Sequence, residues 1–499
     1  MSGTPARRRG SRPATDPARR VALDTLLAVD GRDAYANLLL PQLIRQRGLA
    51  GRDAALATEL CYGTLRGQGT YDAILGVCSD REVGGLDPAV RAALRLGTHQ
   101  LLATRVQPHA AVATSVDLVK AAAGQRPAGF VNAVLRRVAS RDLRAWLEIA
   151  APPADRDLPG ALAVRYSHPR WVVEAFAAAL GETAASGLPQ TEALLAADNR
   201  PPAVHLCAVP GLASQEELTA AGCTPARWSP AGGYLNQGDP AAVAAVAEGR
   251  AGVQDEASQL VALALARADL SRADPRSAGL RSTGLTPPSG RADERWLDVC
   301  AGPGGKARLL SGLAAGAGAR VLASEKREHR ARLVAAATAP ASTAAVIAAD
   351  GTRPAWQTGL FDRVIADVPC SGLGALRRRP EARWRRQPAD VAAIGGLQRD
   401  LLRTSIESAR PGGVVAYVTC SPLPAETSDV VADVLADRDD VEVLDAPGLL
   451  TEVPDLACRG DARYAQFWPH VHDTDAMFLA LLRRRAAADG RAGSGGPGA

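Results

Sequence analysis

A glycine-rich stretch in the second half of the chain has the residues of a ligand-binding turn. It reads Cys300-Ala301-Gly302-Pro303-Gly304-Gly305-Lys306, follows the apolar run Leu297–Val299 and precedes an expected helix over Ala307–Leu313. Glycines let a ligand approach the backbone closely, and the first N–H groups of the helix are free to bind it. Glu325 lies 23 residues after Gly302, close to the spacing at which a carboxylate reaches a ribose diol. The pattern predicts a site for a nucleoside-containing cofactor, with an ordinary strand-to-helix turn as the alternative.

Three other expected strand ends carry acidic or nucleophilic side chains. Asp350 follows one strand, the segment from Asp367 to Cys370 follows the next, and Cys420 follows a third. The carboxyl ends of parallel strands line one crevice, so an aspartate and two thiols are expected to meet beside the cofactor. A thiolate there can act as a nucleophile. A small apolar core residue is the usual role of a cysteine, and it is the interpretation we adopt for the other six.

An arginine-rich segment comes directly after the Asp367 motif. It contains six arginines and one acid between Leu376 and Arg386. Arginine binds phosphates and stacks on bases, and tryptophan offers a further stacking surface. The segment is therefore predicted to form a nucleic-acid-binding lip, with a solvated charged loop as the alternative. The residues assigned to it are Arg377, Arg378, Arg379, Arg383, Trp384, Arg385 and Arg386.

These residues require a sheet that brings them together, and the pattern of apolar runs predicts one. Short apolar runs alternate with helical spacers, which is typical of an α/β Rossmann-like fold with a mostly parallel sheet. The expected strands are Trp296–Cys300, Arg320–Glu325, Ala344–Asp350, Arg363–Val368, Val414–Cys420, Val441–Leu444 and Met477–Leu482.

The preceding part of the chain has a different texture. Residues 17–145 show helical periodicity throughout and predict an all-α domain, in which Arg136 and Arg137 lie on the polar face of a helix. Residues 155–236 predict a small mixed α/β subdomain, and residues 237–486 hold the Rossmann-like domain. Residues 1–16 and 487–499 are expected to be a disordered basic arm and a disordered tail, and residues 268–293 a surface insertion.

Composition limits the class of protein. The 499 residues suggest about three domains. The net charge of +5 is too small for a polycation, so any basic surface must be local. Only three lysines occur, which leaves 55 arginines, a skew that we ascribe mainly to coding preference. No apolar run reaches 18 residues, so no membrane span is expected. The eight cysteines include no C-x-x-C pair, and reduced thiols in a monomeric cytoplasmic protein are expected.

One histidine pair could provide two ligands of a metal site. His470 and His472 would alternate on a strand, but no third ligand stands at a suitable spacing. No metal is therefore expected.

The set of motifs resembles the RNA cytosine-C5 methyltransferase family, whose class I Rossmann-like fold uses S-adenosylmethionine. The segments Cys300–Lys306, Asp367–Gly374 and Thr419–Ser421 occur in the family's order. Two stretches, Arg52–Arg66 and Gly129–Arg137, are similar to the NusB-like RNA-binding domain that is fused to the Sun/Fmu branch, the 16S rRNA methyltransferase B type. The stretches Tyr166–Trp171 and Val253–Ser258 also resemble that branch.

The resemblance implies a role for each site residue. Cys420 would attack cytosine C6, Cys370 would assist loss of the C5 proton and product release, and Asp367 would contact the base. RNA, most readily 16S rRNA, would be the partner, with Arg136 and Arg137 contributing to its binding. The implied cofactor contacts are Cys300, Ala301, Gly302, Pro303, Gly304, Gly305, Lys306, Glu325, Asp350 and Asp367.

The chain departs from the family's pattern at a few positions. Gly302 and Ala307 replace a frequent alanine and a threonine, and Ala425–Thr427 stands where the family usually has Glu-Asn-Glu. Asp475–Phe478 replaces Asp-Gly-Phe-Phe. The open alternatives are a tRNA cytosine-C5 methyltransferase and a non-catalytic RNA-binding or ribosome-assembly factor on the same fold. A DNA cytosine-C5 enzyme is disfavoured by the NusB-like segment.

Overall fold

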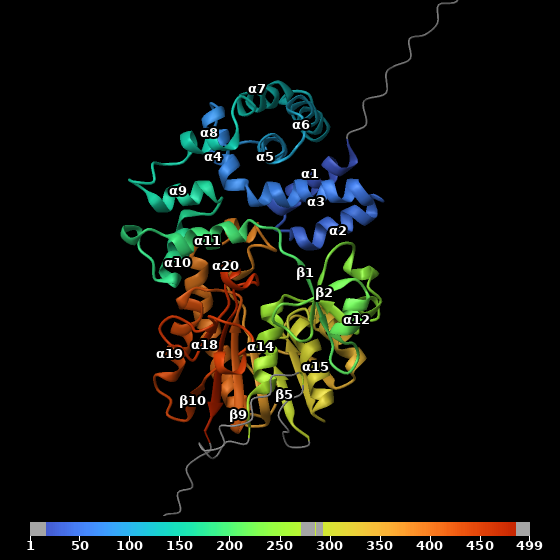
Figure 1. Cartoon of the computed structure of the whole chain (residues 1–499), viewed down its shortest axis with the longest axis vertical. Coiled ribbons are helices and arrows are strands. Elements are labelled where there is room, and N and C mark those ends of the chain that lie inside the picture. The colour runs from blue at the N-terminus through green and yellow to red at the C-terminus, as the bar shows by residue number, and fades with distance from the viewer. Residues whose placement is uncertain (1–15, 271–284, 286–292, 486–499) are drawn as a thin grey trace, which may run out of the picture. The chain divides into compact units, whose positions relative to one another are not determined.

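The computed structural model describes residues 16–270, 285 and 293–485 (Figure 1). The contacts divide the chain into two units. The first comprises Met1–Glu174, Thr183–Asn199 and Arg378–Arg385, and the second comprises Ala175–Glu182, Arg200–Arg377 and Arg386–Ala499. The expected basic arm, surface insertion and C-terminal tail lie almost entirely outside the described residues.

The first unit is helical, as the periodicity predicted for residues 17–145. It also contains α9 and α11, which come from the segment 155–236 that was expected to form a separate mixed subdomain. Asp16 and Asp87 cap two of its helices, since each carboxylate accepts a backbone N–H of the first turn and a proline follows each cap. Its apolar faces form one buried cluster. The helices are α1 (Pro17–Gly31), α2 (Ala36–Gln46), α3 (Gly51–Arg66), α4 (Gln68–Cys78), α5 (Pro88–Ala103), α6 (Pro108–Ala123), α7 (Ala128–Val138), α8 (Leu143–Ala150), α9 (Leu158–Arg165) and α11 (Pro189–Asp198). Helix α10 (Arg170–Leu180) contributes residues to both units.

A segment from late in the sequence completes this helical unit. It is Arg378–Arg385, which ends in the short helix α17 (Ala382–Arg385). Arg383 is fully buried, and its guanidinium donates hydrogen bonds to the carbonyl oxygen of Ser167 at 3.0 Å and to Oδ1 of Asn199 at 2.8 Å. Arg385 donates to carbonyl oxygens at the end of α1, including that of Val29 at 2.8 Å. The segment is thus held by backbone carbonyls as a part of the helical unit.

The second unit contains a small antiparallel sheet. Its strands are β1 (Val204–Ala208), β2 (Cys223–Pro225), β3 (Gly232–Leu235) and β4 (Ala251–Val253), in the order β2-β3-β1-β4. Helices α12 (Gln215–Ala220) and α13 (Ala244–Ala247) belong to the same region. Because β4 pairs with β1, this sheet extends past residue 236, where the sequence suggested a boundary.

The larger sheet has the predicted α/β architecture. Its order is β10-β12-β9-β8-β5-β6-β7, with β11 paired to β12. Strands β5 to β9 pair in parallel, and at one side β12 pairs antiparallel with both β9 and β10. All seven predicted runs are strands, which confirms the fold class. The strands are β5 (Arg295–Asp298), β6 (Arg320–Glu325), β7 (Ala344–Ala348), β8 (Phe361–Asp367), β9 (Ala409–Thr419), β10 (Val441–Leu444), β11 (Ala465–Gln466) and β12 (Phe478–Arg484).

Helices cover both faces of this sheet (Figure 1). Successive residues of β9 show the two faces, since Val414 packs in the cluster of α14 (Glu256–Arg267) and α15 (Gly305–Gly316), and Val415 packs in the cluster of α18 (Pro388–Ser408) and α19 (Ser428–Leu435). Helix α16 (Glu328–Thr338) packs against β6 and β7. The strand expected at His470 and His472 is wrong, because Pro469 starts the short helix α20 (Pro469–His472) there.

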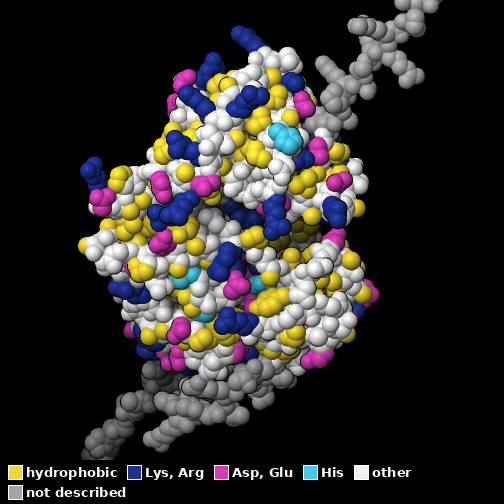
Figure 2. Space-filling view, turned by 45° about the horizontal axis from the view of Figure 1, so that its top comes forward, with side chains coloured by type: hydrophobic (Ala, Val, Ile, Leu, Met, Phe, Trp, Pro, Cys, Tyr) yellow, Lys and Arg dark blue, Asp and Glu magenta, His cyan; other side chains and the backbone are white. Residues whose placement is uncertain are grey.

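Charged side chains are mixed over the surface. On the face in Figure 2, arginine and lysine side chains lie singly or in small groups among acidic and hydrophobic ones. Within the described ranges, no helix combines the length and the apolar character needed to cross a bilayer. In the same residues, no three His, Cys, Asp or Glu side chains cluster as metal ligands would.

The burial of Arg383 leads to a stability prediction. The substitution Arg383→Ala removes a fully buried side chain and leaves one buried and one half-buried acceptor without its donor, so we expect the free energy of unfolding to fall by about 3 kcal/mol. The exposed Arg379, whose guanidinium lies 5.5 Å from the ring centre of Tyr35, is the matched control. Arg379→Ala should cost less than about 1 kcal/mol. Urea denaturation followed by circular dichroism measures both, and equal small losses would contradict this account of the segment.

Candidate active site

The glycine-rich loop links β5 to α15 through backbone conformations that favour glycine. Gly302 and Gly304 have φ values of 59° and 98°. A Cβ atom on Gly304 would lie 2.8 Å from the Cβ of Ala337 and 3.1 Å from the Cα of Val334. The turn is thus both left-handed and pressed against α16, and a side chain at this position would force one of them to move.

Two buried acceptor atoms beside this loop find no donor among the described residues. Asp298, at the end of β5, is fully buried, and its Oδ1 accepts the backbone N–H of Cys300 at 3.3 Å. In the described part of the chain, neither its Oδ2 nor the buried Oε1 of Gln254 has a hydrogen-bond partner. The Cδ of Gln254 lies 3.8 Å from where a Cβ on Gly305 would be. Unpaired buried acceptors are costly, so they fit a ligand that brings donors, such as the ammonium group of S-adenosylmethionine.

The electrostatics at Asp298 fit a cationic ligand as well. Burial, and after it the negative charge of Asp367, raise the pKa of Asp298 to about 7 against the opposing effect of Lys306. A positive group beside it would remove this penalty on the charged form.

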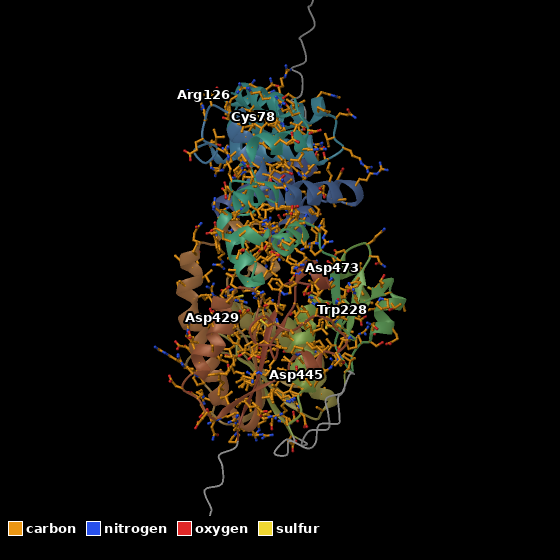
Figure 3. The ribbon with its side chains drawn as sticks, turned by 60° about the vertical axis from the view of Figure 1, so that its left-hand side comes forward. Cys78, Arg126, Trp228, Asp429, Asp445 and Asp473 are labelled. Atoms are coloured by element: carbon orange, nitrogen blue, oxygen red, sulfur yellow. The ribbon has the colours of Figure 1, made fainter. Side chains whose placement is uncertain are left out.

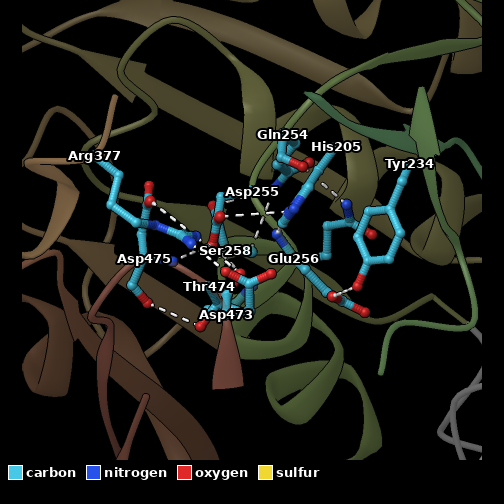
Figure 4. Close-up of polar contacts among 12 residues, drawn as sticks. His205, Tyr234, Gln254, Asp255, Glu256, Ser258, Arg377, Asp473, Thr474 and Asp475 are labelled. Carbon is cyan, nitrogen blue, oxygen red and sulfur yellow. Dashed lines mark hydrogen bonds and ion pairs between the residues drawn. The ribbon is translucent and has the colours of Figure 1, made fainter. Parts of the chain in front are cut away.

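Gln254 is held by the motif Val253–Ser258, which follows β4 (Figure 4). Its Nε2 donates to the Oγ of Ser258 at 3.3 Å. The neighbouring Asp255 accepts the backbone N–H of Asp475 at 3.2 Å, and Glu256 accepts the hydroxyl of Tyr234. The motif therefore joins the small sheet, the start of α14 and the loop before β12, and it fixes Gln254 against the glycine-rich turn.

Glu325 and Asp350 lie at the ends of β6 and β7, next to β5 in the sheet. Glu325 is buried, and its Oε1 accepts the backbone N–H of Arg327 at 2.9 Å. Asp350 accepts Lys326 Nζ at 2.8 Å and the hydroxyl of Thr352. The hydrogen bond from Lys326 and those from Thr352 lower the pKa of Asp350 to about 2. Both carboxylates occupy the sheet edge on which the sequence placed them.

A buried ion pair links the loop to β8. Lys306 Nζ lies 2.8 Å from Oδ2 of Asp367, and the lysine side chain is only 9% exposed. Burial lowers the pKa of Lys306, but the attraction of Asp367 outweighs it, and the charge of Cys420 raises it further. The sequence named both partners but did not predict that they pair.

The two thiols meet at the same edge. Sγ of Cys370 lies 3.3 Å from Sγ of Cys420. The backbone N–H of Gly374 donates to the carbonyl of Cys420 at 2.9 Å, and a Cβ on Gly374 would lie 2.1 Å from the carbonyl oxygen of Ala476. The hydrogen bond with Cys420 raises the pKa of Cys370 well above its usual range, together with burial and the charges of Cys420 and Glu426.

The arginine-rich lip is only partly as predicted. Arg377 is buried and pairs with Asp473 (Figure 4), and Arg383 is buried in the helical unit. Both guanidinium groups are occupied by protein acceptors, so their direct contact with RNA is not supported. Arg386 donates to the carbonyl of Ser371 at 3.1 Å, beside the thiols. Arg379 and, on α7, Arg136 and Arg137 are exposed.

Three residues of the site are not predicted by the sequence motifs: Asp298, Gln254 and Glu426. Asp298 is the acidic residue just before the glycine-rich turn, a signal that was visible. Gln254 lies within Val253–Ser258, a stretch that resembles the family but whose residue types indicate no chemistry by themselves. Glu426 lies in one of the segments that depart from the family's pattern, and only the fold shows its partners.

Two family models match this chain. Residues 286–483 match the model described as 16S rRNA methyltransferase RsmB/F, and residues 16–140 match the NusB family.

Curated relatives cover nearly the whole chain. The protein Rv1407 of Mycobacterium tuberculosis (strain ATCC 25618 / H37Rv), named there as a methyltransferase, is 51% identical over 482 residues, which are 96% of this chain and 99% of that protein. The ribosomal RNA small subunit methyltransferase B of Pseudomonas syringae pv. tomato is 31% identical over 96% of this chain and 99% of its own.

Solved structures share the fold. The crystal structure of PH0851 has a TM-score of 0.73 at 19% identity and covers 95% of this chain and all of that chain. NSun6 from Pyrococcus horikoshii with SFG has a TM-score of 0.50 at 16% identity and covers 64% of this chain and 98% of its own.

The crowded left-handed turn at Gly304 leads to a binding prediction. Gly304→Ala places a Cβ against α16 and should weaken the binding of S-adenosylmethionine at least about tenfold, which corresponds to about 1.4 kcal/mol. Gly316→Ala, in the same helix and with open space around it, is the control and should leave the affinity unchanged. Isothermal titration calorimetry measures both, and equal affinities for the two variants would contradict the role of the turn.

Proposed function

We propose that this chain, which belongs to the RsmB/F family of 16S rRNA methyltransferases, transfers the methyl group of S-adenosylmethionine to C5 of a cytosine in 16S rRNA. The observation that carries the proposal is the pair of thiols 3.3 Å apart, at the same sheet edge as the Lys306–Asp367 ion pair. Such a pair suits a reaction in which a base is first bonded to the enzyme and then released.

The chemistry begins with a nucleophile, because cytosine C5 is too poor a nucleophile to accept a methyl group unaided. Addition of the Cys420 thiolate to C6 makes C5 nucleophilic. S-adenosylmethionine, when bound, would supply an electrophilic methyl group to C5, and the broken S–CH3 bond would leave the neutral thioether S-adenosylhomocysteine. Loss of the C5 proton, assisted by Cys370, then restores the ring as the bond between C6 and Sγ breaks. The thiolate of Cys420 is regenerated, so the chain ends the cycle unchanged.

The surrounding charges favour Cys420 as the nucleophile and Cys370 as the group that assists release. The ammonium group of Lys306 and the charge of Cys420 attract each other, which favours the thiolate form of Cys420. The charge of Glu426 instead helps to keep the proton on Cys370. Once Cys420 is bonded to C6 it is no longer charged, so one cause of the raised pKa of Cys370 disappears. Cys370 then loses its proton more readily, at the stage when the C5 proton must leave.

The remaining site residues position the two substrates. Lys306 holds Asp367, which would hydrogen-bond the amino edge of the cytosine. Asp298 and Gln254 would accept from the ammonium group of the cofactor, and Glu325 and Asp350 would hold its nucleoside. The target base must leave any helix to reach the thiols, and the exposed Arg379, Arg136 and Arg137 are the candidate phosphate contacts. The proposed location is the cytoplasm, where 16S rRNA is found, and the proposed state is a monomer.

Bisulfite sequencing of RNA from cells with and without the protein tests the substrate. A cytosine of 16S rRNA should resist conversion only when the protein is present. Protection of a tRNA cytosine alone, or of no cytosine, would overturn the proposal in favour of a tRNA enzyme or a non-catalytic factor.

Exchanging either thiol tests the mechanism. Cys420→Ala should abolish both methylation and any covalent complex with RNA, since the attacking group is lost. Cys370→Ala should instead accumulate a covalent complex, because release is impaired. A denaturing gel of protein, RNA and S-adenosylmethionine separates these outcomes, and the reverse pattern between the two variants would contradict the assignment.

The raised pKa of Asp298 predicts a pH-dependent affinity. If the cofactor's ammonium group binds the ionised carboxylate, the association constant should rise about tenfold per pH unit below a pKa of about 7 and then level off. Asp298→Asn cannot ionise and should bind more weakly at pH 8, with no such rise. Calorimetry between pH 5.5 and about 8.5 measures this, and a wild-type affinity with the same pH profile as the variant would refute it.

A further inference from the structure

A buried carboxylate joins the two loops that carry the thiols. Glu426 lies in the short helix η5 (Pro424–Glu426), just after β9, and none of it is exposed. Its Oε1 accepts the backbone N–H of Ser371 at 2.6 Å, and its Oε2 accepts the hydroxyls of Ser371 at 2.6 Å and of Ser421 at 2.5 Å. These serines directly follow Cys370 and Cys420. One side chain therefore ties both cysteine loops together.

Among the described residues, only these three hydrogen bonds offset the cost of burying the Glu426 carboxylate. Among the described residues, no basic side chain lies within 4 Å of its carboxylate, and the donors are one amide and two hydroxyls. A buried carboxylate without a cation is costly. An apolar side chain of similar volume would fill the same space without that cost. Filling space therefore does not account for a negative charge at this position.

Opposite charges flank the thiol pair. The positive Lys306, from α15, interacts with Cys420, and the negative Glu426, from η5, interacts with Cys370. Asp367 neutralises part of the lysine charge at 2.8 Å. The buried hydroxyl of Tyr417 donates to the carbonyl oxygen of Glu426 at 2.8 Å and holds η5 against β9.

We propose that Glu426 is a positioning residue that fixes the spacing of the two thiols, and that its negative charge keeps the proton of the resting pair on Cys370. This inference rests on the proposed function, in which Cys420 attacks and Cys370 assists release. The charge of Glu426 contributes to the raised pKa of Cys370, in agreement with that placement. The carboxylate does not touch the RNA base in this account; it acts only through the two cysteines.

Thiol reactivity tests the charge without any RNA. In the full-length protein, alkylation by iodoacetamide should modify Cys420 at least about tenfold faster than Cys370, as peptide mass spectrometry can measure, because the thiolate is the reactive form. Glu426→Gln keeps the shape but removes the charge, and should bring the two rates to within about threefold of each other. Glu426→Asp keeps the charge and should preserve the preference for Cys420.

Steady-state methylation tests the positioning. Glu426→Asp has a shorter side chain that cannot hold both loops, and in Glu426→Gln the amide nitrogen cannot accept a hydrogen bond as the second carboxylate oxygen does. Each should therefore lower kcat about 10- to 100-fold with little change in KM for RNA. Asp429→Asn on the exposed side of α19 (Figure 3) is the local control and should keep the wild-type kcat. Glu294→Gln, which removes a buried carboxylate from another part of the second unit, should lower stability without altering the ratio of alkylation rates.

The outcomes separate this inference from the proposed function. An unchanged preference for Cys420 in Glu426→Gln, or the same loss of preference in Glu294→Gln, would overturn the role of the charge. A wild-type kcat in Glu426→Asp would overturn the positioning role. If the alkylation rates behave as expected but the wild-type protein methylates no RNA, the proposed function fails and the inference about the thiol pair stands.

Discussion

The parallel pairing of β8 with β9 is the constraint on which the site depends. In this register Asp367 lies opposite Val418, and the N–H of Val368 donates to the carbonyl of Val418 at 3.0 Å. Two cysteines 50 residues apart in the sequence therefore leave the sheet side by side. A shift of the register by two residues would move one thiol by about 7 Å, at about 3.3 Å per residue, and would end their contact.

In the proposed mechanism, charge makes two chemically identical side chains different. Lys306, at the glycine-rich turn, interacts electrostatically with Cys420, and Glu426, after β9, interacts electrostatically with Cys370. Both side chains are buried, where the effective dielectric constant is lower and their fields are weakly screened. Weak screening also matters at Asp298. Its carboxylate is buried and, among the described residues, its Oδ2 has no hydrogen-bond partner, so a positively charged ligand would be favoured beside it. A few buried charges therefore influence the chemistry of the site more than the number of its polar groups does.

Much of the fold and part of the site could be predicted from the sequence. Short apolar runs separated by helical spacers predicted the strands of the large sheet. The strand ends predicted Asp350, Asp367, Cys370 and Cys420 at one edge, because a parallel sheet places its carboxyl ends there. Periodicity could not show which charges pair. Lys306 and Asp367 are 61 residues apart, and nothing local indicates their contact.

For the arginine-rich segment, composition predicts exposed side chains, but the structure buries two of them. Its local composition is typical of an exposed nucleic-acid-binding loop, but Arg377 and Arg383 are buried against partners from distant parts of the chain. A guanidinium has five donors and can satisfy several carbonyl oxygens at once, so it serves equally well inside a protein. Sequence alone does not distinguish the two uses, since the acceptors are brought in by the fold.

Peptide mapping of a trapped complex tests the central claim most directly. An RNA fragment with 5-fluorocytidine at the target position should remain bonded to the enzyme, because fluorine cannot leave C5 as the proton does. After incubation with S-adenosylmethionine and digestion, mass spectrometry should find one nucleotide attached to Cys420 and carrying the transferred methyl group. Attachment at Cys370, or no attachment while ordinary cytosine is still methylated, would contradict the account.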